Sequence, residues 1–179
     1  MPDLIPGDKI LDFFHDGFQH TAWRLETRRA YAADQRGDAY RRFLRGEPRQ
    51  VNPDDQWAAM VRTQVADGKR IERVRVLDDP LTENQRYSLT SVVDNLAAGE
   101  DIRYLFRDQA VQLDLPDEDA WLFDARQVAR FHWDENGWAT HLEVVDDPAE
   151  VVRYCRVRDA AWHYAIGYAD LKARVPSAV

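Results

Sequence analysis

Residues 70–77 read Arg-Ile-Glu-Arg-Val-Arg-Val-Leu, and the alternation of charged and apolar side chains predicts a strand. The turn residues Asp78-Asp79-Pro80 end it. Thr82 is a good helix cap, and the apolar periodicity after it predicts a helix that ends near Gly99. A second strand is expected over residues 102–106. A strand, a helix and a strand in this order indicate an α/β unit.

The chain before this unit predicts another strand and two helices. Residues 22–27 place Trp23 and Leu25 on one side and charged side chains on the other, which is the period of a half-buried strand, with a short helix as the alternative. A helix is expected over residues 35–44. The next helix should begin at a cap on Asn52 and end at Gly68.

The chain after it predicts an antiparallel meander. Its three strands are expected over residues 120–124, 127–134 and 138–145. Asn136-Gly137 between two alternating runs favours a two-residue type I′ hairpin turn. That turn would pair Phe131 with Leu142 on the core face, and Trp133 with Thr140 beyond them.

Asp146-Asp147-Pro148 predicts the start of one long helix that runs to about Leu171. Its buried stripe is expected to contain Val151, Cys155, Trp162, Ile166 and Ala169. The fold class is therefore α/β (α+β), a mixed sheet with the meander at residues 120–145, helices packed on it and a long C-terminal helix. We expect a single domain over residues 1–179.

Composition excludes several classes of function. The net charge is −8, which argues against non-specific binding to DNA or to anionic membranes. Cys155 is the only cysteine, so a disulfide framework and a cysteine zinc site are excluded, and a reducing compartment fits. No signal peptide or membrane-spanning run of ~20 apolar residues is visible, so we expect a cytoplasmic protein.

Arginines on neighbouring strands form the first candidate site. Arg73 and Arg75 point the same way from their strand, and Arg103 lies on the next strand, so together they could bind a phosphate or carboxylate. The alternative is a structural network with Glu26, Glu72 or Glu100. Further residues that could line such a ligand site are His20, Arg24 and Glu26.

A histidine pair forms the second candidate site. His132 would lie directly opposite His141, with Cβ atoms ~5 Å apart, close enough to share a divalent metal ion. Asp134 or Glu143 could add an oxygen ligand. We favour the alternative, in which this face of the sheet is solvated and Arg130 pairs with Glu143, because the two histidines lack a recognised metal-ligand spacing.

Other motifs point away from catalysis. Residues 114–119 are rich in acidic side chains but lack the glycine of a calcium loop, so we expect a solvated turn that includes Asp119. No Gly-x-Ser-x-Gly, phosphate-loop, dinucleotide-binding or His-Glu-x-x-His motif occurs. Whether the protein is an enzyme stays open, with a non-catalytic domain favoured.

Five stretches resemble an uncharacterised actinobacterial family of domains of unknown function: 23–31, 73–82, 98–103, 115–124 and 158–162. The family's members are often encoded beside helix-turn-helix regulators, which implies a regulatory or partner-binding role. Direct contact with nucleic acid is not expected, because the net charge is −8. The strand that ends in Phe123-Asp124 is also distantly similar to a phospholipase D-like half-domain, but the catalytic His-x-Lys of that superfamily is absent.

Three hypotheses for function follow. The first is a non-catalytic regulatory or interaction domain that partners a helix-turn-helix regulator. The second is a sensor or enzyme for an anionic small molecule at the arginine-bearing strands. The third is a metal-dependent activity at His132 and His141.

Overall fold

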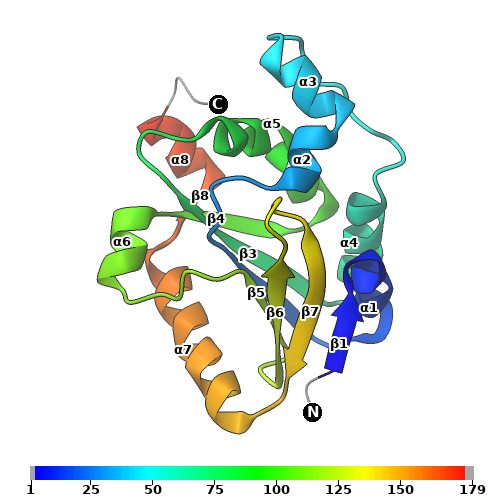
Figure 1. The fold of residues 1–179 in the computed structure, drawn as a ribbon, viewed down its shortest axis with the longest axis vertical. Helices are drawn as coiled ribbons and strands as arrows, with labels where there is room; N and C mark the ends of the chain where they lie inside the picture. The colour runs from blue at the N-terminus through cyan, green and yellow to red at the C-terminus, as the bar shows by residue number, and fades with distance from the viewer. Residues whose placement is uncertain (1–2, 176–179) are drawn as a thin grey trace.

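The computed structural model describes residues 3–175 and has a central mixed sheet of eight strands (Figure 1). The strands are β1 Asp3–Pro6, β2 Thr21–Glu26, β3 Arg70–Leu77, β4 Asp101–Phe106, β5 Ala120–Phe123, β6 Gln127–Trp133, β7 Ala139–Val145 and β8 Ile166–Gly167. Their order in the sheet is β1-β7-β6-β5-β2-β3-β4-β8. β2, β3 and β4 run parallel, and the other neighbours are antiparallel. The predicted mixed α/β class is confirmed.

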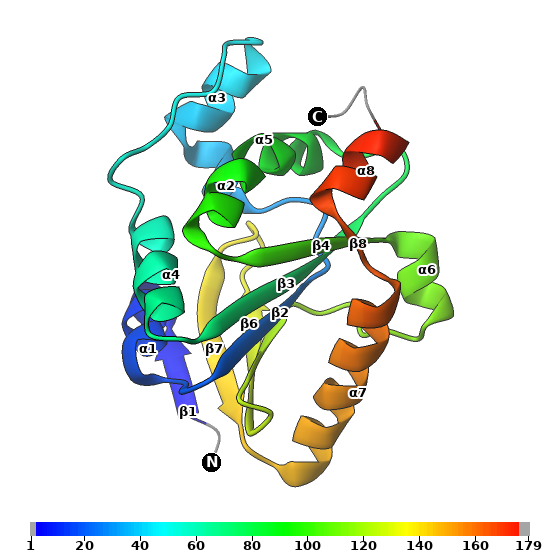
Figure 2. The ribbon, with the colours of Figure 1, turned by 180° about the vertical axis from the view of Figure 1, so that it is seen from behind.

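Helices cover both faces of the sheet (Figure 2). They are the short 3-10 helix Gly7–Lys9 and α1 Ile10–Asp16, α2 Ala32–Arg36, α3 Asp38–Leu44, α4 Gln56–Ala66, α5 Glu83–Ala98, α6 Arg107–Gln112, α7 Pro148–Tyr164 and α8 Tyr168–Arg174. One face packs on α1 and α4 through Phe14, Val61 and Ile71. The opposite face packs on α7 through Trp23 and Tyr154.

A third cluster joins α5 to the sheet. Leu89 and Val92 of α5 pack with Ile102 and Tyr104 of β4. These β4 residues are on the same face as the α1 and α4 cluster, since Ile102 is the register partner of Arg73. On this face of the sheet, the side chains of β2 and β3 therefore lie between α4 and α5.

β2 is confirmed as a strand, but it lies inside the sheet rather than half-exposed. It pairs with β3 on one edge and with β5 on the other. Trp23 and Leu25 are buried beneath α7, and the charged residue Glu26 on the opposite face is only 7% exposed. An alternating pattern thus marks a strand whose two faces are both covered, one of them by polar groups.

The β6–β7 hairpin has the predicted register but a different turn. Phe131 pairs with Leu142, as expected, and the register holds as far as His132. A shift then pairs Trp133 with Ala139, so the predicted pairing of Trp133 with Thr140 is wrong.

The turn contains three residues, not the predicted two. The Gly137 N–H donates to the Asp134 carbonyl (3.1 Å), and the Asp134 N–H donates to the Trp138 carbonyl (2.9 Å). Gly137 has a φ of 80°, whereas Asn136 does not take the positive φ of a type I′ turn. The Asp134 carboxylate accepts from the N–H groups of Asn136 and Trp138, and these bonds favour the longer loop.

The predicted long C-terminal helix is interrupted. α7 ends at Tyr164, Ala165 is extended, and β8 pairs with β4 before α8 begins. This short strand covers the edge of β4, which would otherwise leave backbone groups without partners. The buried stripe of α7 contains Val151, as expected, but continues through Tyr154, Val157 and Ala161, while Cys155 is half-buried.

Smaller differences concern helix ends and short elements. The predicted helix at 35–44 is split at Gly37 into α2 and α3. α4 is capped by Asp55, not Asn52, because the Asp55 carboxylate accepts from the N–H groups of Trp57 and Ala58. β1, α1 and α6 are short elements that the sequence analysis did not anticipate.

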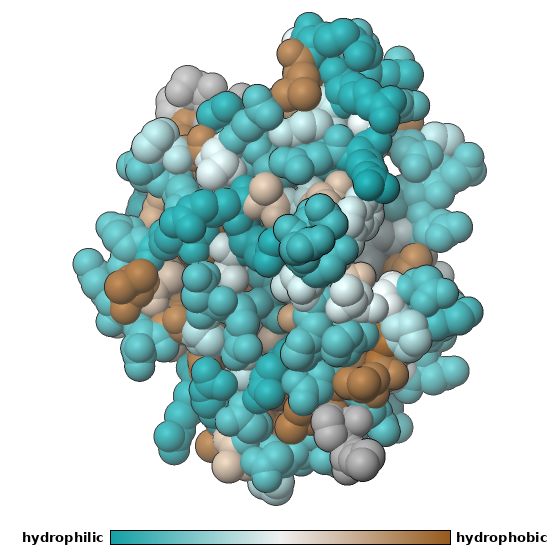
Figure 3. Space-filling model, in the orientation of Figure 1, coloured by the Kyte–Doolittle hydropathy of each residue, from teal (hydrophilic) through white to brown (hydrophobic). Residues whose placement is uncertain are grey.

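The face of the molecule shown in Figure 3 is largely hydrophilic and carries scattered hydrophobic side chains. Exposed apolar residues such as Leu4, Val51 and Val111 lie in separate segments of the chain: β1, the loop before α4, and α6. Among residues 3–175, no helix is long and apolar enough to cross a membrane.

Candidate functional site: a cavity over the central strands

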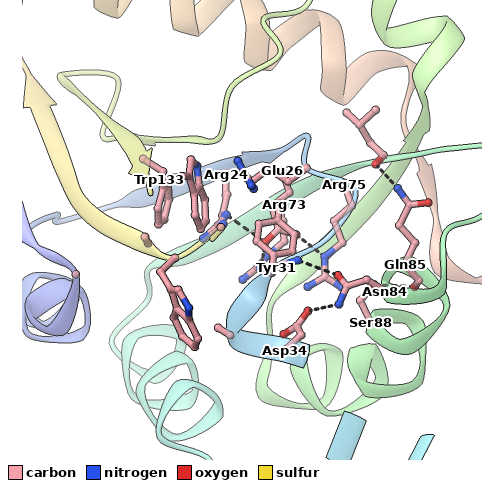
Figure 4. A pocket seen from close by; sticks show the side chains of 18 of the residues that line it. Arg24, Glu26, Tyr31, Asp34, Arg73, Arg75, Asn84, Gln85, Ser88 and Trp133 are labelled. Carbon is pink, nitrogen blue, oxygen red and sulfur yellow. Dashed lines mark hydrogen bonds and ion pairs between the residues drawn. The ribbon is translucent and has the colours of Figure 1, made fainter. Parts of the chain in front are cut away.

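A cavity of about 550 Å³ lies over the carboxyl ends of β2 and β3 (Figure 4). The chain from β3 turns at residues 78–82 into α5, so the first turns of α5 pass beside this end of the sheet. The tip of the β6–β7 hairpin lies beside α2 on the other side (Figure 1). The lining includes Arg24, Glu26, Arg28, Tyr31, Asp34, Arg73, Arg75, Asn84, Gln85, Ser88, Phe131, Trp133, Gly137 and Trp138.

Glu26 is the centre of the charged floor of this cavity. Its carboxylate accepts hydrogen bonds from Arg73 Nη1 (2.7 Å) and Arg75 Nε, and lies 3.1 Å from Arg24 Nε. Arg73 also donates to Glu100 (2.7 Å). The floor is thus a buried ion network rather than a row of free arginines.

The strand register explains this convergence. Alternate residues of a strand share a face, and parallel β2 and β3 pair Arg24 with Arg73 and Glu26 with Arg75. Burial alone would raise the pKa of Glu26, but the guanidiniums of Arg73, Arg75 and Arg24 outweigh it and hold that pKa far below its usual range. Glu26 is therefore ionised in the folded protein at neutral pH.

A second buried carboxylate, Asp119, fixes the segment that lines one side of the cavity. It accepts from the Thr27 N–H (2.8 Å), the Tyr31 hydroxyl (2.8 Å) and Arg24 Nη2 (3.2 Å). Asp119 is only 1% exposed, so the expectation that it belongs to a solvated turn is wrong. The physical reason is that residues 27–31 supply donors that replace water around the carboxylate.

Aromatic side chains line the hairpin side. Phe131 and Trp133 are stacked with ring centroids 5.3 Å apart, and Tyr31 lies 5.7 Å from Trp133. The Arg24 guanidinium lies 4.3 Å from the Phe131 ring centroid, and that of Arg28 lies 4.5 Å from the Trp133 centroid. The cavity therefore combines a charged floor with an aromatic wall.

The structure brings together four of the six residues suggested for ligand binding: Arg24, Glu26, Arg73 and Arg75. The three arginines form an ion network with Glu26 and Glu100, which is the alternative that the sequence left open. The same three arginines and Glu26 also line the cavity. The aromatic wall and the contributions of Tyr31, Asp34, Asn84 and Ser88 were not predicted from the sequence. The alternation of Phe131 and Trp133 was a usable signal, but their distance from β3 along the chain hid the connection.

Arg103 and His20 lie elsewhere, so placing them in one site with the other four was wrong. Arg103 is the register partner of Val74, which puts it on the opposite face, where its guanidinium lies 3.8 Å from the Trp162 ring centroid. His20 is exposed just before β2, and its backbone N–H donates to Asp124.

His132 and His141 are opposite each other as predicted, with stacked rings 4.4 Å apart and 5° from parallel. The nitrogen lone pairs lie in the ring planes, so those of two parallel rings do not converge on one ion. Within residues 3–175 no group of three or more His, Cys, Asp or Glu side chains is arranged to hold a metal. His132 Nε2 instead lies 3.2 Å from Glu143, which also pairs with Arg130 (3.7 Å) as expected.

Fold and site together define a mixed α/β protein with a polar and aromatic cavity over its parallel strands. The chain belongs to the family described as a domain of unknown function (DUF6879), whose model matches residues 8–173. The family resemblance is thereby confirmed, whereas the actinobacterial origin and the neighbouring regulator genes stay predictions. No curated protein matches the sequence.

Two solved structures are similar to this chain. NucT from Helicobacter pylori is 9% identical with a TM-score of 0.54, and the match covers 94% of this chain and 99% of NucT. The archaeal chromatin protein TrmBL2 is 13% identical with a TM-score of 0.49, and the match covers 93% of this chain. This chain spans about half (55%) of the length of that TrmBL2 chain. At 9% identity the similarity to NucT shows a shared fold alone, and the phospholipase D-like analogy stays a prediction.

Proposed function

We propose that this protein is a non-catalytic sensor domain that binds a small molecule in the cavity over β2 and β3. The observation that carries the proposal is the cavity itself, about 550 Å³ in volume, with an aromatic wall and a buried charged floor. Small-molecule sites are concave, fall in this range of volume and combine apolar walls with a few fixed polar groups. The network on Glu26 fixes the floor before any ligand arrives, which reduces the entropic cost of binding.

The chemistry of the lining favours binding over catalysis. The residues that line the cavity include no histidine or cysteine, and the hydroxyl of Ser88 donates to the carbonyl of Gln85 on its own helix. The Tyr31 hydroxyl donates to Asp119, and burial, reinforced by the nearby carboxylates, raises the pKa of that phenol well above its ordinary value. Neither hydroxyl is paired with a neutral base that could activate it.

A regulatory role for the bound state is the second part of the proposal. The segment at 28–34 and the hairpin tip both line the cavity, and both are near the surface. A ligand that contacts both would change how they pack, and a partner could recognise that change. The resemblance to a family encoded beside helix-turn-helix regulators suggests such a regulator as the partner. Co-purification of the two proteins tests the regulatory role separately. The absence of a complex at micromolar concentrations would contradict it.

Thermal-shift screening against a broad library of metabolites tests the sensor proposal. A ligand present at 100 times its Kd adds about 2.7 kcal/mol of stability, which corresponds to roughly 5–11 °C for a domain of this size. Ser88→Phe would fill the cavity from α5 and should abolish the shift. Ser91→Phe, one turn further along α5 and outside the lining, is the matched control and should retain it. The absence of any shift across the library would refute the proposal.

A further inference from the structure

We infer that the ligand of this cavity is a neutral, flat heterocycle that presents an N–H donor beside a carbonyl or ring-nitrogen acceptor, as nucleobases and xanthines do. This inference rests on the proposed sensor function and names the chemical class of its ligand. It differs from the anionic ligand that the arginine-bearing strands suggested from the sequence.

Arg75 supplies the hydrogen-bond donor. Its Nε donates to Glu26, while its Nη1 is buried without a partner among the described residues. A buried N–H on a charged group costs free energy when it stays unpaired, so a ligand acceptor beside it is strongly favoured. The side chain lines the cavity, and Figure 4 shows its guanidinium beside Tyr31 and Asn84.

Asp34 supplies the hydrogen-bond acceptor. Its Oδ2 accepts from Asn84 Nδ2 (3.3 Å), and no bond within the described chain engages Oδ1. Arg75 is close enough to influence the titration of Asp34, yet no hydrogen bond joins them. Both side chains line the cavity near the start of α5 (Figure 4). A ligand edge with an acceptor next to a donor would bridge the two.

The balance of charge argues for a neutral ligand. The cavity and its floor contain four guanidiniums and four carboxylates: Arg24, Arg28, Arg73, Arg75, Glu26, Asp34, Glu100 and Asp119. At the edge, Asp8 lines the cavity and Arg36 lies over Trp138, which adds one charge of each sign. Arg28 has no carboxylate partner among the described residues, but Asp34 has no guanidinium partner either, so these two charges offset each other. An anionic ligand would therefore leave one negative charge uncompensated, and burying such a charge is costly.

The aromatic wall argues for a flat ligand. Phe131, Trp133 and Trp138 line the hairpin side and Tyr31 lines the adjoining segment. Aromatic side chains pack favourably against flat rings in offset or edge-to-face arrangements. A heterocycle held at its edge by Arg75 and Asp34 would have its ring in this part of the cavity.

Isothermal titration calorimetry with matched pairs of compounds tests the inference. Theophylline differs from caffeine, and uridine from 3-methyluridine, by the replacement of one N–H by N-methyl. We expect a parent compound to bind and its N-methyl analogue to bind at least tenfold more weakly, since the analogue leaves the Asp34 acceptor unpaired. Indole-3-acetate and indole-3-acetamide form a third pair, in which the anion should bind more weakly than the neutral amide.

Variants locate the binding site. Arg75→Lys keeps a positive charge beside Glu26 but removes the forked N–H edge, and Asp34→Ala removes the acceptor at a half-buried position. Each should weaken binding of the parent compound at least tenfold, with the circular dichroism spectrum unchanged. Arg103→Lys, on the opposite face of the sheet, is the matched control and should bind as the wild type does.

The outcomes separate the two proposals. If N-methyl analogues bind as tightly as their parents, or if the anion binds more tightly than the amide, the ligand class is wrong while the sensor function stands. If library compounds bind in a manner sensitive to Ser88→Phe but no parent heterocycle binds, the class is again wrong. If nothing binds in either experiment, the sensor function itself is wrong.

Discussion

Replacing Glu26 by Gln should destabilise the protein by about 3 kcal/mol at pH 7. The carboxylate is bonded to Arg73 and Arg75 and paired with Arg24, and it is only 7% exposed. Glutamine keeps the shape but removes the charge, so one buried guanidinium (Arg73) and two largely buried ones (Arg24 and Arg75) lose part of their charge compensation. Breaking a buried ion pair from one side typically costs ~3–5 kcal/mol, and the remaining pair between Arg73 and Glu100 moderates the loss.

The pH dependence gives a sharper test of the same reasoning. The folded-state pKa of Glu26 is held below its ordinary value, since the surrounding guanidiniums outweigh the effect of burial. Its stabilisation is therefore fully present above the unfolded-state pKa of about 4.3 and is lost as pH falls through the acidic range below it. The difference in stability between wild type and Glu26→Gln should shrink steadily below pH 4.

Urea unfolding followed by tryptophan fluorescence, at intervals from pH 7 to pH 3, measures both quantities. Glu47→Gln is the matched control, because Glu47 is exposed and pairs with Arg45 at the surface, and it should leave stability essentially unchanged. A loss below ~1 kcal/mol for Glu26→Gln at pH 7, or a loss independent of pH, would refute this account of the network.

Three further substitutions probe local features, each measured by urea unfolding. Gly99→Ala should cost about 2 kcal/mol, because φ is +104° and the new Cβ would lie 3.0 Å from Val65 Cγ1; a cost below 0.5 kcal/mol would contradict this. Thr82→Ala should cost ~1 kcal/mol through loss of the capping box of α5, and no change would count against it. Asp124→Asn should cost ~1–2 kcal/mol at pH 7 and progressively less below pH 4. Burial alone would raise the pKa of Asp124, but hydrogen bonds from three backbone N–H groups outweigh it and lower that pKa. A cost that stays constant with pH would contradict this.

Periodicity in the sequence was sufficient to predict the central elements. β3, α5, β4 and the meander strands all lie close to their predicted ranges, because alternation and capping are local properties. The predicted pairing of Phe131 with Leu142 is also confirmed, since the hairpin places both strands next to each other in the chain. The break at Ala165 was not predictable from the sequence, because the reason for it is the edge of β4, which is more than 60 residues away.

The candidate site could be predicted only in part, for a similar reason. The alternation that put Arg24 with Glu26, and Arg73 with Arg75, is a property of each strand alone. Arg103 was misplaced because the register between β3 and β4, which pairs it with Val74, is not written in either strand. The aromatic wall could not be predicted, because its position depends on the tip of the β6–β7 hairpin lying beside the end of β2, which is about 100 residues earlier in the chain.

A paired replacement separates what the ion network does for the fold from what it does for the cavity. In Glu26→Leu/Arg75→Met, one charge of each sign is removed, and Arg73 and Arg24 keep Glu100 and Asp119 as partners. Replacing a buried ion pair by apolar residues of similar size is often neutral or stabilising, so the double variant should be within about 1 kcal/mol of wild type and more stable than Glu26→Gln. It should nevertheless lose the thermal shift of any ligand found for the cavity, because the donor edge of Arg75 is gone.

A double variant as unstable as Glu26→Gln would mean that β2 needs the charges to fold. Retained stability without ligand binding would assign the network to the cavity, since the packing of Trp23 and Leu25 beneath α7 is enough to hold β2 in the sheet.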